Sequence, residues 1–375
     1  MSTPLAGVRV ISLEQAAAAP LCTRRLVLAG AEVIKIEREE GDFARGYDTA
    51  VHGQSSYFVW LNAGKKSVVL DLKRTADVDQ LKKLISLSDV LVQNLKPGAL
   101  AKLGIDLTEL HAQQPKLISV SVSGFAPSGP GSERKAYDLL MQAESGLAEI
   151  TGSHHEAGRV GISIVDVATG MYAYEAVLEA LLVRHGSQQG MRISVSLFDA
   201  VGDLLTVPYL LERYGGQAPK RVGLAHPGIC PYGVFSSSDG VRFVLSVQNE
   251  REWRRLCNVA LADDELGADP RCLSNELRVE NRPFVDGRLT EAFGAANYSE
   301  LQKRLTQADL AFAPVNPIDA LKHHPDFHSM TVTLGDETVA LPVVPGLEKP
   351  DLLPVPSLGE HSEEVLNWLD SQQQK

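Results

Sequence analysis

An aspartate that ends an apolar run is the residue in this sequence best suited to chemistry. Asp166 lies in the segment GISIVDVATG, and the apolar residues after it recur at three- and four-residue spacings. This spacing predicts an amphipathic helix over residues 167–184, with Asp166 at or near its N-cap and Gly186 as the stop. Free backbone N–H groups and the helix dipole would keep the carboxylate ionised there. Such a carboxylate is a candidate nucleophile. The plainer interpretation is that it only caps the helix.

The composition indicates a large, acidic protein with free thiols. The chain has 375 residues, 44% of them apolar, which is enough for more than one domain. Its net charge of −11 argues against nucleic acid or a membrane as the main partner. No apolar stretch approaches about 18 residues and no leader segment begins the chain, so we expect a soluble, cytoplasmic protein. The cysteines lack disulfide or metal-site spacing and are expected to be free thiols: Cys22, Cys230, Cys257 and Cys272.

Strand and helix patterns alternate through the first two hundred residues. Parallel strands need long connections, which helices supply, so the alternation predicts an α/β fold with a large parallel-sheet, Rossmann-like domain over residues 1–215. Strands are expected at 8–13, 32–37, 67–72, 89–95, 116–125 and 191–198. Helices are expected at 20–28, 78–87, 137–147, 167–184 and 199–214.

The pattern changes after a segment rich in Gly and Pro. Residues 216–233 read as a linker, and residues 234–328 as a smaller α+β domain that opens with a hairpin over 234–247. Helices are expected there at 250–261, 276–293 and 299–305. Residues 329–375, with strands at 330–334 and 338–344 and a helix at 363–369, form a C-terminal segment expected to return to the large domain.

Several common catalytic signatures are missing. The first strand–helix unit lacks G-x-G-x-x-G, which weakens a dehydrogenase interpretation, and no G-x-S-x-G supports a serine hydrolase. The histidine clusters at 154–155 and 323–328 do not have metal-ligand spacing, so no metal is expected. Polar residues instead follow or flank successive elements, namely Arg38, Lys73, Asn94, Lys102 and Lys135. Individually each is a solvated surface group, but together at one sheet edge they could bind a phosphate-rich ligand.

The chain resembles the family III CoA-transferases nearly end to end. That family includes formyl-CoA transferase and is similar in fold to α-methylacyl-CoA racemase. The stretches that carry the resemblance are PLAGVRVISLEQ, GAEVIKIEREEGDFARG, NAGKKSVVLDLK, VLVQNLKPGALAKLGID, SGFAPSGPGSERKAYDLLMQAESGL, GISIVDVATGMYAY and LGEHSEEVL.

The resemblance implies an enzyme that moves CoA between carboxylic acids, with CoA thioesters as substrates and no permanently bound cofactor. It implies that Asp166 is the nucleophile and forms an aspartyl anhydride and then an aspartyl-CoA thioester, and that Gln15 lies beside the reacting carbonyl. It also implies an interlocked homodimer. The CoA contacts that it implies are Arg38, Lys73, Asn94, Lys102, Lys135 and Tyr137.

Two departures from formyl-CoA transferase bear on the substrate. Asp138, a candidate catalytic acid, stands where that enzyme has a longer glutamate, and its glycine-rich loop is replaced by the shorter segment 224–230. The chain looks closer to the branch that acts on mesaconate, citramalate or itaconate, with succinyl-CoA as expected donor. A dicarboxylate needs a partner for its second carboxylate, and the candidates in loop-like segments are Arg45, His52 and His226.

Two other functions are kept as alternatives. A 2-methylacyl-CoA racemase needs an acid–base pair, and the racemase branch has a histidine before the acid that is Asp138 here. Tyr137 takes that place, and a phenol with a pKa of about 10 is a poor base at neutral pH. A non-catalytic CoA-binding protein, in which Asp166 only caps its helix, is the alternative from another class.

Overall fold

The computed structural model describes residues 3–346 and 352–372, and the chain divides into two compact units. The larger unit comprises residues 1–147, 160–207 and 328–375, and the smaller comprises 148–159 and 208–327. The α/β fold with a second, smaller sheet domain is confirmed. The domain boundaries expected from the sequence stay a prediction. No helix among the described residues is long and apolar enough to cross a membrane.

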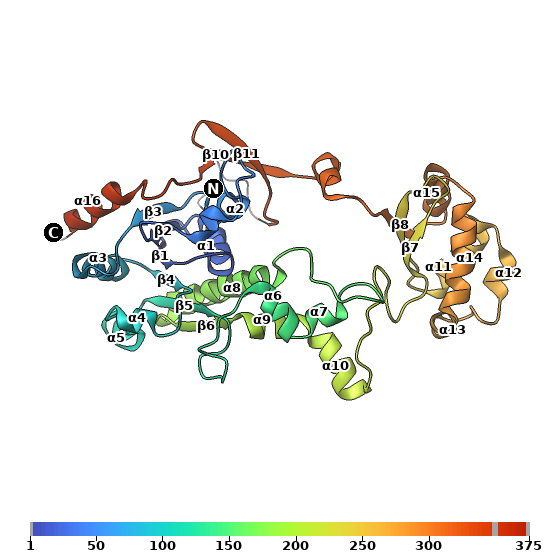
Figure 1. Cartoon of the computed structure of the whole chain (residues 1–375), viewed down its shortest axis with the longest axis horizontal. Helices are drawn as coiled ribbons and strands as arrows, with labels where there is room; N and C mark the ends of the chain where they lie inside the picture. Colours follow the sequence, from blue (N-terminus) through green and yellow to red (C-terminus); the bar gives the residue numbers. More distant parts are fainter. Residues whose placement is uncertain (1–2, 347–351, 373–375) are drawn as a thin grey trace. The chain divides into compact units, whose positions relative to one another are not determined.

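The large unit is built on a parallel sheet of six strands in the order β3-β2-β1-β4-β5-β6 (Figure 1). The chain runs outward from β1 to β3, then returns to the other side of β1 for β4 to β6. This reversal leaves a crevice at the carboxyl ends of β1 and β4, where open α/β sheets bind ligands. The strands are β1 (Arg9–Leu13), β2 (Glu32–Glu37), β3 (Lys66–Val69), β4 (Val90–Gln93), β5 (Ile118–Ser123) and β6 (Arg192–Ser196).

Helices cover both faces of this sheet, which explains why strand side chains are buried on both sides of it. Neighbouring strand residues point to opposite faces, so Val10 lies in the core on one face and Ile11 in the core on the other. The first face packs against α1 (Ala18–Leu28), α8 (Ile164–Ser187) and α9 (Leu197–Leu204). The second packs against α3 (Thr75–Ser86), α4 (Ala99–Lys102), α5 (Leu107–Gln113) and α16 (Ser362–Gln372).

Shorter elements complete the large unit. A three-stranded sheet in the order β11-β10-β12 packs its buried side on α2. The bounds are η1 (Phe43–Gly46), α2 (Ser56–Asn62), α6 (Asp138–Glu144), β10 (Ser329–Leu334), β11 (Glu337–Pro342) and β12 (Leu353–Pro354). The helix α7 (Leu147–Ile150) begins at the last residue of segment 1–147 of the large unit, and its other residues belong to the smaller unit.

The smaller unit contains an antiparallel sheet in the order β7-β8-β9, and the predicted hairpin over 234–247 is confirmed. Phe235, Phe243 and Phe293 pack edge to face or tilted at its core. The predicted helix 276–293 is divided at Asn281. The bounds are α10 (Thr206–Gly215), β7 (Tyr232–Ser236), β8 (Arg242–Ser246), α11 (Glu250–Arg255), η2 (Leu256–Leu261), α12 (Asp264–Ala268), α13 (Asn275–Glu280), α14 (Arg282–Gly294), α15 (Tyr298–Gln307), β9 (Ala311–Pro314) and η3 (Ile318–His323). All four cysteines of the chain are buried and free.

The helix that carries Asp166 differs at both ends from the sequence prediction. It begins at Ile164 after Ser163, and it ends at Ser187 with Gln188 in the left-handed conformation at φ 58°. Gly186 therefore lies inside the helix and does not stop it. Along its length α8 packs on α1, and at Gly170 the two helices approach so closely that a Cβ would lie 2.6 Å from the carbonyl oxygen of Ala18.

We expect Gly170→Ala to lower the free energy of unfolding by about 1–3 kcal/mol, because its methyl group overlaps α1. Gly186→Ala in the same helix is the matched control, since a Cβ there meets no atom within 4 Å. Alanine's better helix propensity should make that variant more stable by up to about 1 kcal/mol. Urea denaturation measures both values. Equal effects at the two positions would contradict the close contact between α1 and α8.

Candidate functional site

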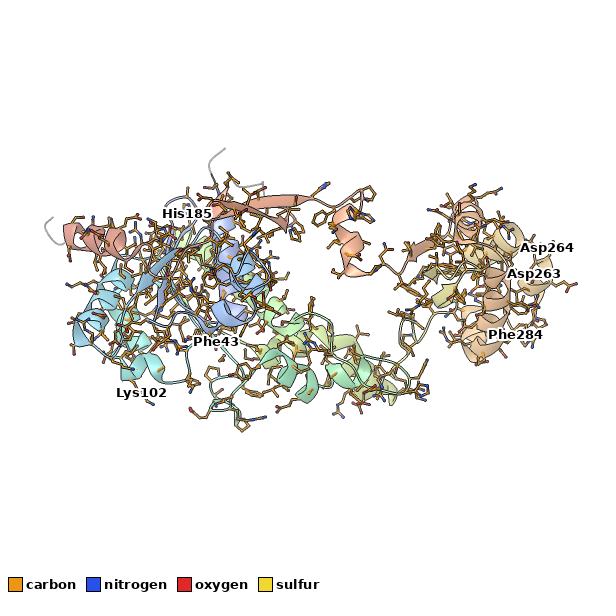
Figure 2. The ribbon with its side chains drawn as sticks, turned by 45° about the horizontal axis from the view of Figure 1, so that its top comes forward. Phe43, Lys102, His185, Asp263, Asp264 and Phe284 are labelled. Atoms are coloured by element: carbon orange, nitrogen blue, oxygen red, sulfur yellow. The ribbon has the colours of Figure 1, made fainter. Side chains whose placement is uncertain are left out.

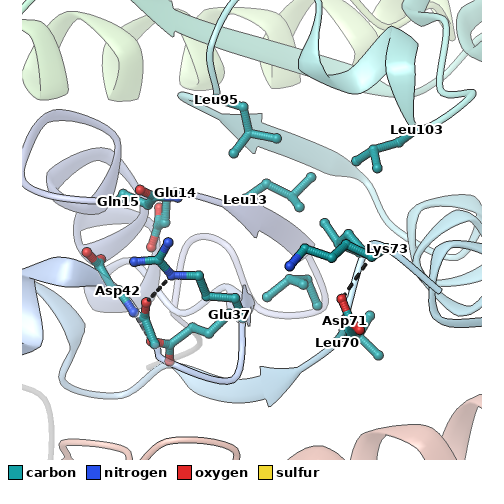
Figure 3. Close-up of a pocket in the computed structure, with 14 residues that line it drawn as sticks. Leu13, Glu14, Gln15, Glu37, Asp42, Leu70, Asp71, Lys73, Leu95 and Leu103 are labelled. Atoms are coloured by element: carbon teal, nitrogen blue, oxygen red, sulfur yellow. Dashed lines mark hydrogen bonds between the residues drawn. The ribbon is translucent and has the colours of Figure 1, made fainter.

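A pocket of about 330 Å³ opens at the carboxyl ends of β1, β2 and β3 (Figure 3). Gln15, Arg38 and Lys73, three residues predicted from the sequence, line it together with the leucines at 13, 70, 72, 95 and 103. Arg38 and Lys73 are exposed at the mouth, and Arg38 Nε donates to the Gly41 carbonyl at 3.0 Å and lies 3.5 Å from Glu40 Oε2. The pocket therefore combines an apolar lining with cationic groups at one edge of the sheet.

Two further predicted residues lie next to this pocket. Asn94 follows β4, and its side chain hydrogen bonds to the backbone of Gln15. Lys102 is exposed at the end of α4 (Figure 2), one position before Leu103 in the pocket lining. The structure thus gathers Gln15, Arg38, Lys73 and Asn94 from four different strand ends, as the sequence led us to expect.

A cluster of six charged residues, most of them buried, forms part of the pocket wall and extends behind it. Glu14, Glu37 and Asp42 line the pocket, and their partners behind the wall are Lys35, Lys65 and Arg45. Three carboxylates thus face three cations, so the cluster is neutral overall. Five of the six side chains are at most 1% exposed, where an unpaired charge would be very unfavourable.

Short contacts connect the members of this cluster. Lys65 Nζ lies 2.6 Å from Glu14 Oε1, and Lys35 Nζ lies 2.7 Å from Asp42 Oδ2. Burial alone would raise the pKa of Glu37, but the hydrogen bonds of Arg45 and the charge of Lys35 outweigh it and lower that pKa to about 2. Burial lowers the pKa of Lys65 to about 8, although Glu14 opposes the shift.

Asp138, not Asp166, accepts the free N–H groups at the start of α8. Its Oδ1 accepts hydrogen bonds from the backbone N–H of Val165 at 2.8 Å and of Asp166 at 3.3 Å. Its Oδ2 accepts a hydrogen bond from Gln142 Nε2 at 2.6 Å. The predicted capping role of Asp166 is therefore wrong, because a carboxylate from another helix already fills that place. Asp166 lies in the first turn of α8 with its side chain partly buried.

The charge state of Asp166 also differs from the prediction. Burial, and after it the negative charge of Asp138, raise the pKa of Asp166 from 3.8 to about 7. The expectation that the helix terminus keeps this carboxylate fully ionised is wrong. No hydrogen bond to the Asp166 carboxylate is found within residues 3–346 and 352–372, so nothing offsets the loss of hydration. A carboxylate of this kind is a strong nucleophile once it is ionised.

A sequence model of CoA-transferase family III matches residues 5–362. The chain belongs to this family. Succinate–glutarate CoA-transferase of Agrobacterium fabrum is 32% identical over 98% of the chain and 96% of its own length. Succinyl-CoA:glutarate CoA-transferase of Homo sapiens is 30% identical over 97% and 85%. The crystal structure of a CAIB/BAIF family protein from Brucella suis is 30% identical, has a TM-score of 0.85, and covers 99% of the chain and 100% of its own.

These findings confirm the resemblance stated from the sequence, and the protein is a CoA-transferase. Within the transferase, aromatic residues near Asp166 were missed by the sequence reasoning. Burial, followed by the charges of Asp42 and Asp166, raises the pKa of Tyr47 to about 12, so its hydroxyl stays protonated. The Tyr57 hydroxyl is 2.8 Å from the Ser163 hydroxyl, one residue before α8. The sequence does not indicate that Tyr47 and Tyr57 lie near Asp166, because they are more than a hundred residues away from it in the chain.

The remaining predicted residues lie outside the pocket of the transferase. Lys135 and Tyr137 are exposed just before α6. The Arg45 guanidinium donates two hydrogen bonds to Glu37 and is therefore already paired. His52 is exposed with φ 48°, and the ring of His226 stacks on Tyr232 within the smaller unit. Substrate or CoA binding by these five residues stays a prediction.

We expect Asp166→Asn to be more stable than the natural protein at pH 8, and this difference in stability to be much smaller at pH 5. The folded protein keeps the Asp166 proton up to about pH 7, whereas the unfolded chain releases it near pH 4, so the stability of the natural protein falls between these values. The difference at pH 8 is up to about 4 kcal/mol. Denaturation at both pH values measures it. A variant less stable than the natural protein at pH 8 would refute the raised pKa.

Proposed function

We propose that this CoA-transferase moves CoA from succinyl-CoA to a dicarboxylic acid of four or five carbons, with Asp166 as the nucleophile. The observation that carries the proposal is the Asp166 carboxyl itself, partly buried, with a raised pKa and close to the charge of Asp138. The six-residue charge cluster has each carboxylate paired with a cation. Asp166 has no such partner among the described residues.

The reaction must preserve the energy of the thioester, so water must not be the acceptor. In the first step an Asp166 oxygen attacks the succinyl carbonyl, the carbon–sulfur bond breaks, and CoA leaves as a thiolate. The thiolate then attacks the aspartyl carbonyl of the resulting anhydride, which releases succinate and leaves an aspartyl-CoA thioester. No proton or water is consumed in either step.

The second half of the reaction runs in reverse with a different acid. The acceptor carboxylate attacks the aspartyl thioester and displaces the CoA thiolate. The thiolate attacks the acceptor's carbonyl in the new anhydride, which forms the product thioester and restores the Asp166 carboxylate. Gln15 and backbone N–H groups are assigned to stabilise the oxyanions, an effect often worth about 3–4 kcal/mol for each donor.

The binding roles follow the placement of the charged groups. Arg38 and Lys73 at the pocket mouth are assigned to the phosphates of CoA, because guanidinium and ammonium groups form charge-assisted hydrogen bonds with phosphate oxygens. The acceptor class is supported by relatives named for dicarboxylates, the succinate–glutarate enzyme and the succinyl-CoA–D-citramalate enzyme of Chloroflexus aurantiacus, which is 31% identical over 76% of the chain. The interlocked homodimer and the cytoplasmic location remain part of the proposal.

Transfer should disappear in Asp166→Ala. We expect the natural protein to convert succinyl-CoA and one or more of glutarate, mesaconate, itaconate, citramalate and malate to new CoA esters, read by mass spectrometry, whereas oxalate and formate react poorly. Asp203→Ala is the matched control. The exposed Asp203 carboxylate on α9 accepts a hydrogen bond from the hydroxyl of Tyr172, which lies on α8 as Asp166 does. Turnover in folded Asp166→Ala at more than about a hundredth of the natural rate would exclude the aspartyl intermediate.

The pH dependence of the rate should follow the Asp166 carboxyl. We expect kcat/KM for succinyl-CoA to fall as the pH drops below about 7, because protonation removes the nucleophile. Asp138→Asn should move this inflection to lower pH, because the neighbouring negative charge is lost while the burial remains. Asp203→Asn serves as the control and should leave it unchanged. A profile that is flat from pH 5 to pH 8 would contradict this assignment.

A further inference from the structure

The backbone of the loop after β1 is held in an unusual conformation. Ala16 has φ 64°, in the left-handed region that residues with a Cβ rarely adopt. Such a conformation persists only when the surroundings fix it on several sides, and it tends to occur at functional sites. Gln15 precedes Ala16 directly, so the same constraint sets the direction in which the Gln15 side chain leaves the loop.

The Asn94 side chain bonds to both backbone groups of Gln15, in two successive peptide units of this loop. Its Oδ1 accepts a hydrogen bond from the Gln15 N–H at 2.9 Å, and its Nδ2 donates one to the Gln15 carbonyl at 2.8 Å. Asn94 is itself fixed to the sheet, because its backbone N–H donates to the Leu13 carbonyl at 3.1 Å. The Asn94 side-chain amide therefore uses both its oxygen and its nitrogen to bind the backbone of Gln15.

A second anchor holds the following residue. The Ala16 N–H donates to Asp42 Oδ1 at 3.2 Å, and Asp42 Oδ2 is bound by the buried Lys35 at 2.7 Å. Asp42 is thus tied into the neutral charge cluster behind the pocket wall. With its backbone fixed from two sides, Gln15 lines the pocket, and its side-chain amide has no hydrogen bond within residues 3–346 and 352–372.

We propose that Asn94 is a positioning residue, which acts by holding the Gln15 backbone so that the free Gln15 amide faces the reacting carbonyl. The inference rests on the proposed role of Gln15 in stabilising the oxyanion. It departs from the role that the family resemblance implies for Asn94, direct contact with CoA. The two roles predict different kinetics, since a lost CoA contact raises KM for the acyl-CoA, whereas a misplaced catalytic amide lowers kcat.

A double-mutant cycle with Asn94→Ala and Gln15→Ala tests the proposal. We expect Asn94→Ala to lower kcat by about tenfold to a hundredfold and to leave KM for succinyl-CoA within about twofold. In the Gln15→Ala background, the same change should lower kcat by less than about twofold, because the group that Asn94 positions is already gone.

Gln93→Ala is the matched control. Gln93 is the neighbouring amide on β4, and it also makes two side-chain hydrogen bonds, to the Ser121 hydroxyl and to the Leu95 N–H, but none to Gln15. This variant should keep the natural kcat. Thermal unfolding of every variant checks the fold, and if Asn94→Ala does not fold, Asn94→Asp replaces it, because it retains the acceptor for the Gln15 N–H and loses the donor to the carbonyl.

The outcomes separate this inference from the function it rests on. If Gln15→Ala keeps its kcat, the proposed role of Gln15 is wrong, while the nucleophile test at Asp166 still stands. If Gln15→Ala is slow but Asn94→Ala acts on KM alone, the positioning role is overturned and CoA contact is favoured. Fully additive effects of the two changes on kcat would also overturn it. A loss of kcat in Asn94→Ala that vanishes in the Gln15→Ala background supports it.

Discussion

Burial and, after it, the Asp138 carboxylate together raise the pKa of Asp166. By accepting hydrogen bonds from the N–H groups of Val165 and Asp166, Asp138 occupies the positive end of α8 that would otherwise stabilise the Asp166 carboxylate. Its negative charge adds to the effect of burial and raises the Asp166 pKa to about 7. The hydrogen bonds from Val165 and Asp166 to Asp138 therefore join α6 to the start of α8, next to the candidate nucleophile.

The charge cluster behind the pocket gives the site a rigid wall. Its three carboxylates come from the ends of β1 and β2 and the turn after them, and every one meets a cation within 2.7 Å. A buried pair of this kind contributes little net stability compared with apolar packing, but removing one partner leaves an uncompensated charge. The cluster therefore fixes the relative positions of the strand ends, and through Asp42 it reaches the backbone of the loop that carries Gln15.

The strand order explains how residues distant in sequence meet at this site. Because the chain returns to pair β4 beside β1, Asn94 comes within hydrogen-bond distance of Gln15, 79 positions earlier. The pocket lies on the same edge of the sheet, at the carboxyl ends of the strands. The contact between Asn94 and the constrained loop at the side of the pocket is thus a consequence of this topology.

The sequence by itself determined the family and the parallel sheet, and it singled out Asp166 as the candidate nucleophile. The apolar run of β4 (Val90–Gln93) is a local pattern, and so is the helical spacing after Asp166. Only the tertiary structure decided that Asp138 caps α8, that Arg45 is paired with Glu37, and that Asn94 holds the Gln15 backbone. The hydration and charge of a side chain depend on its neighbours in the folded protein. A local sequence pattern carries no information about neighbours that are distant in the sequence.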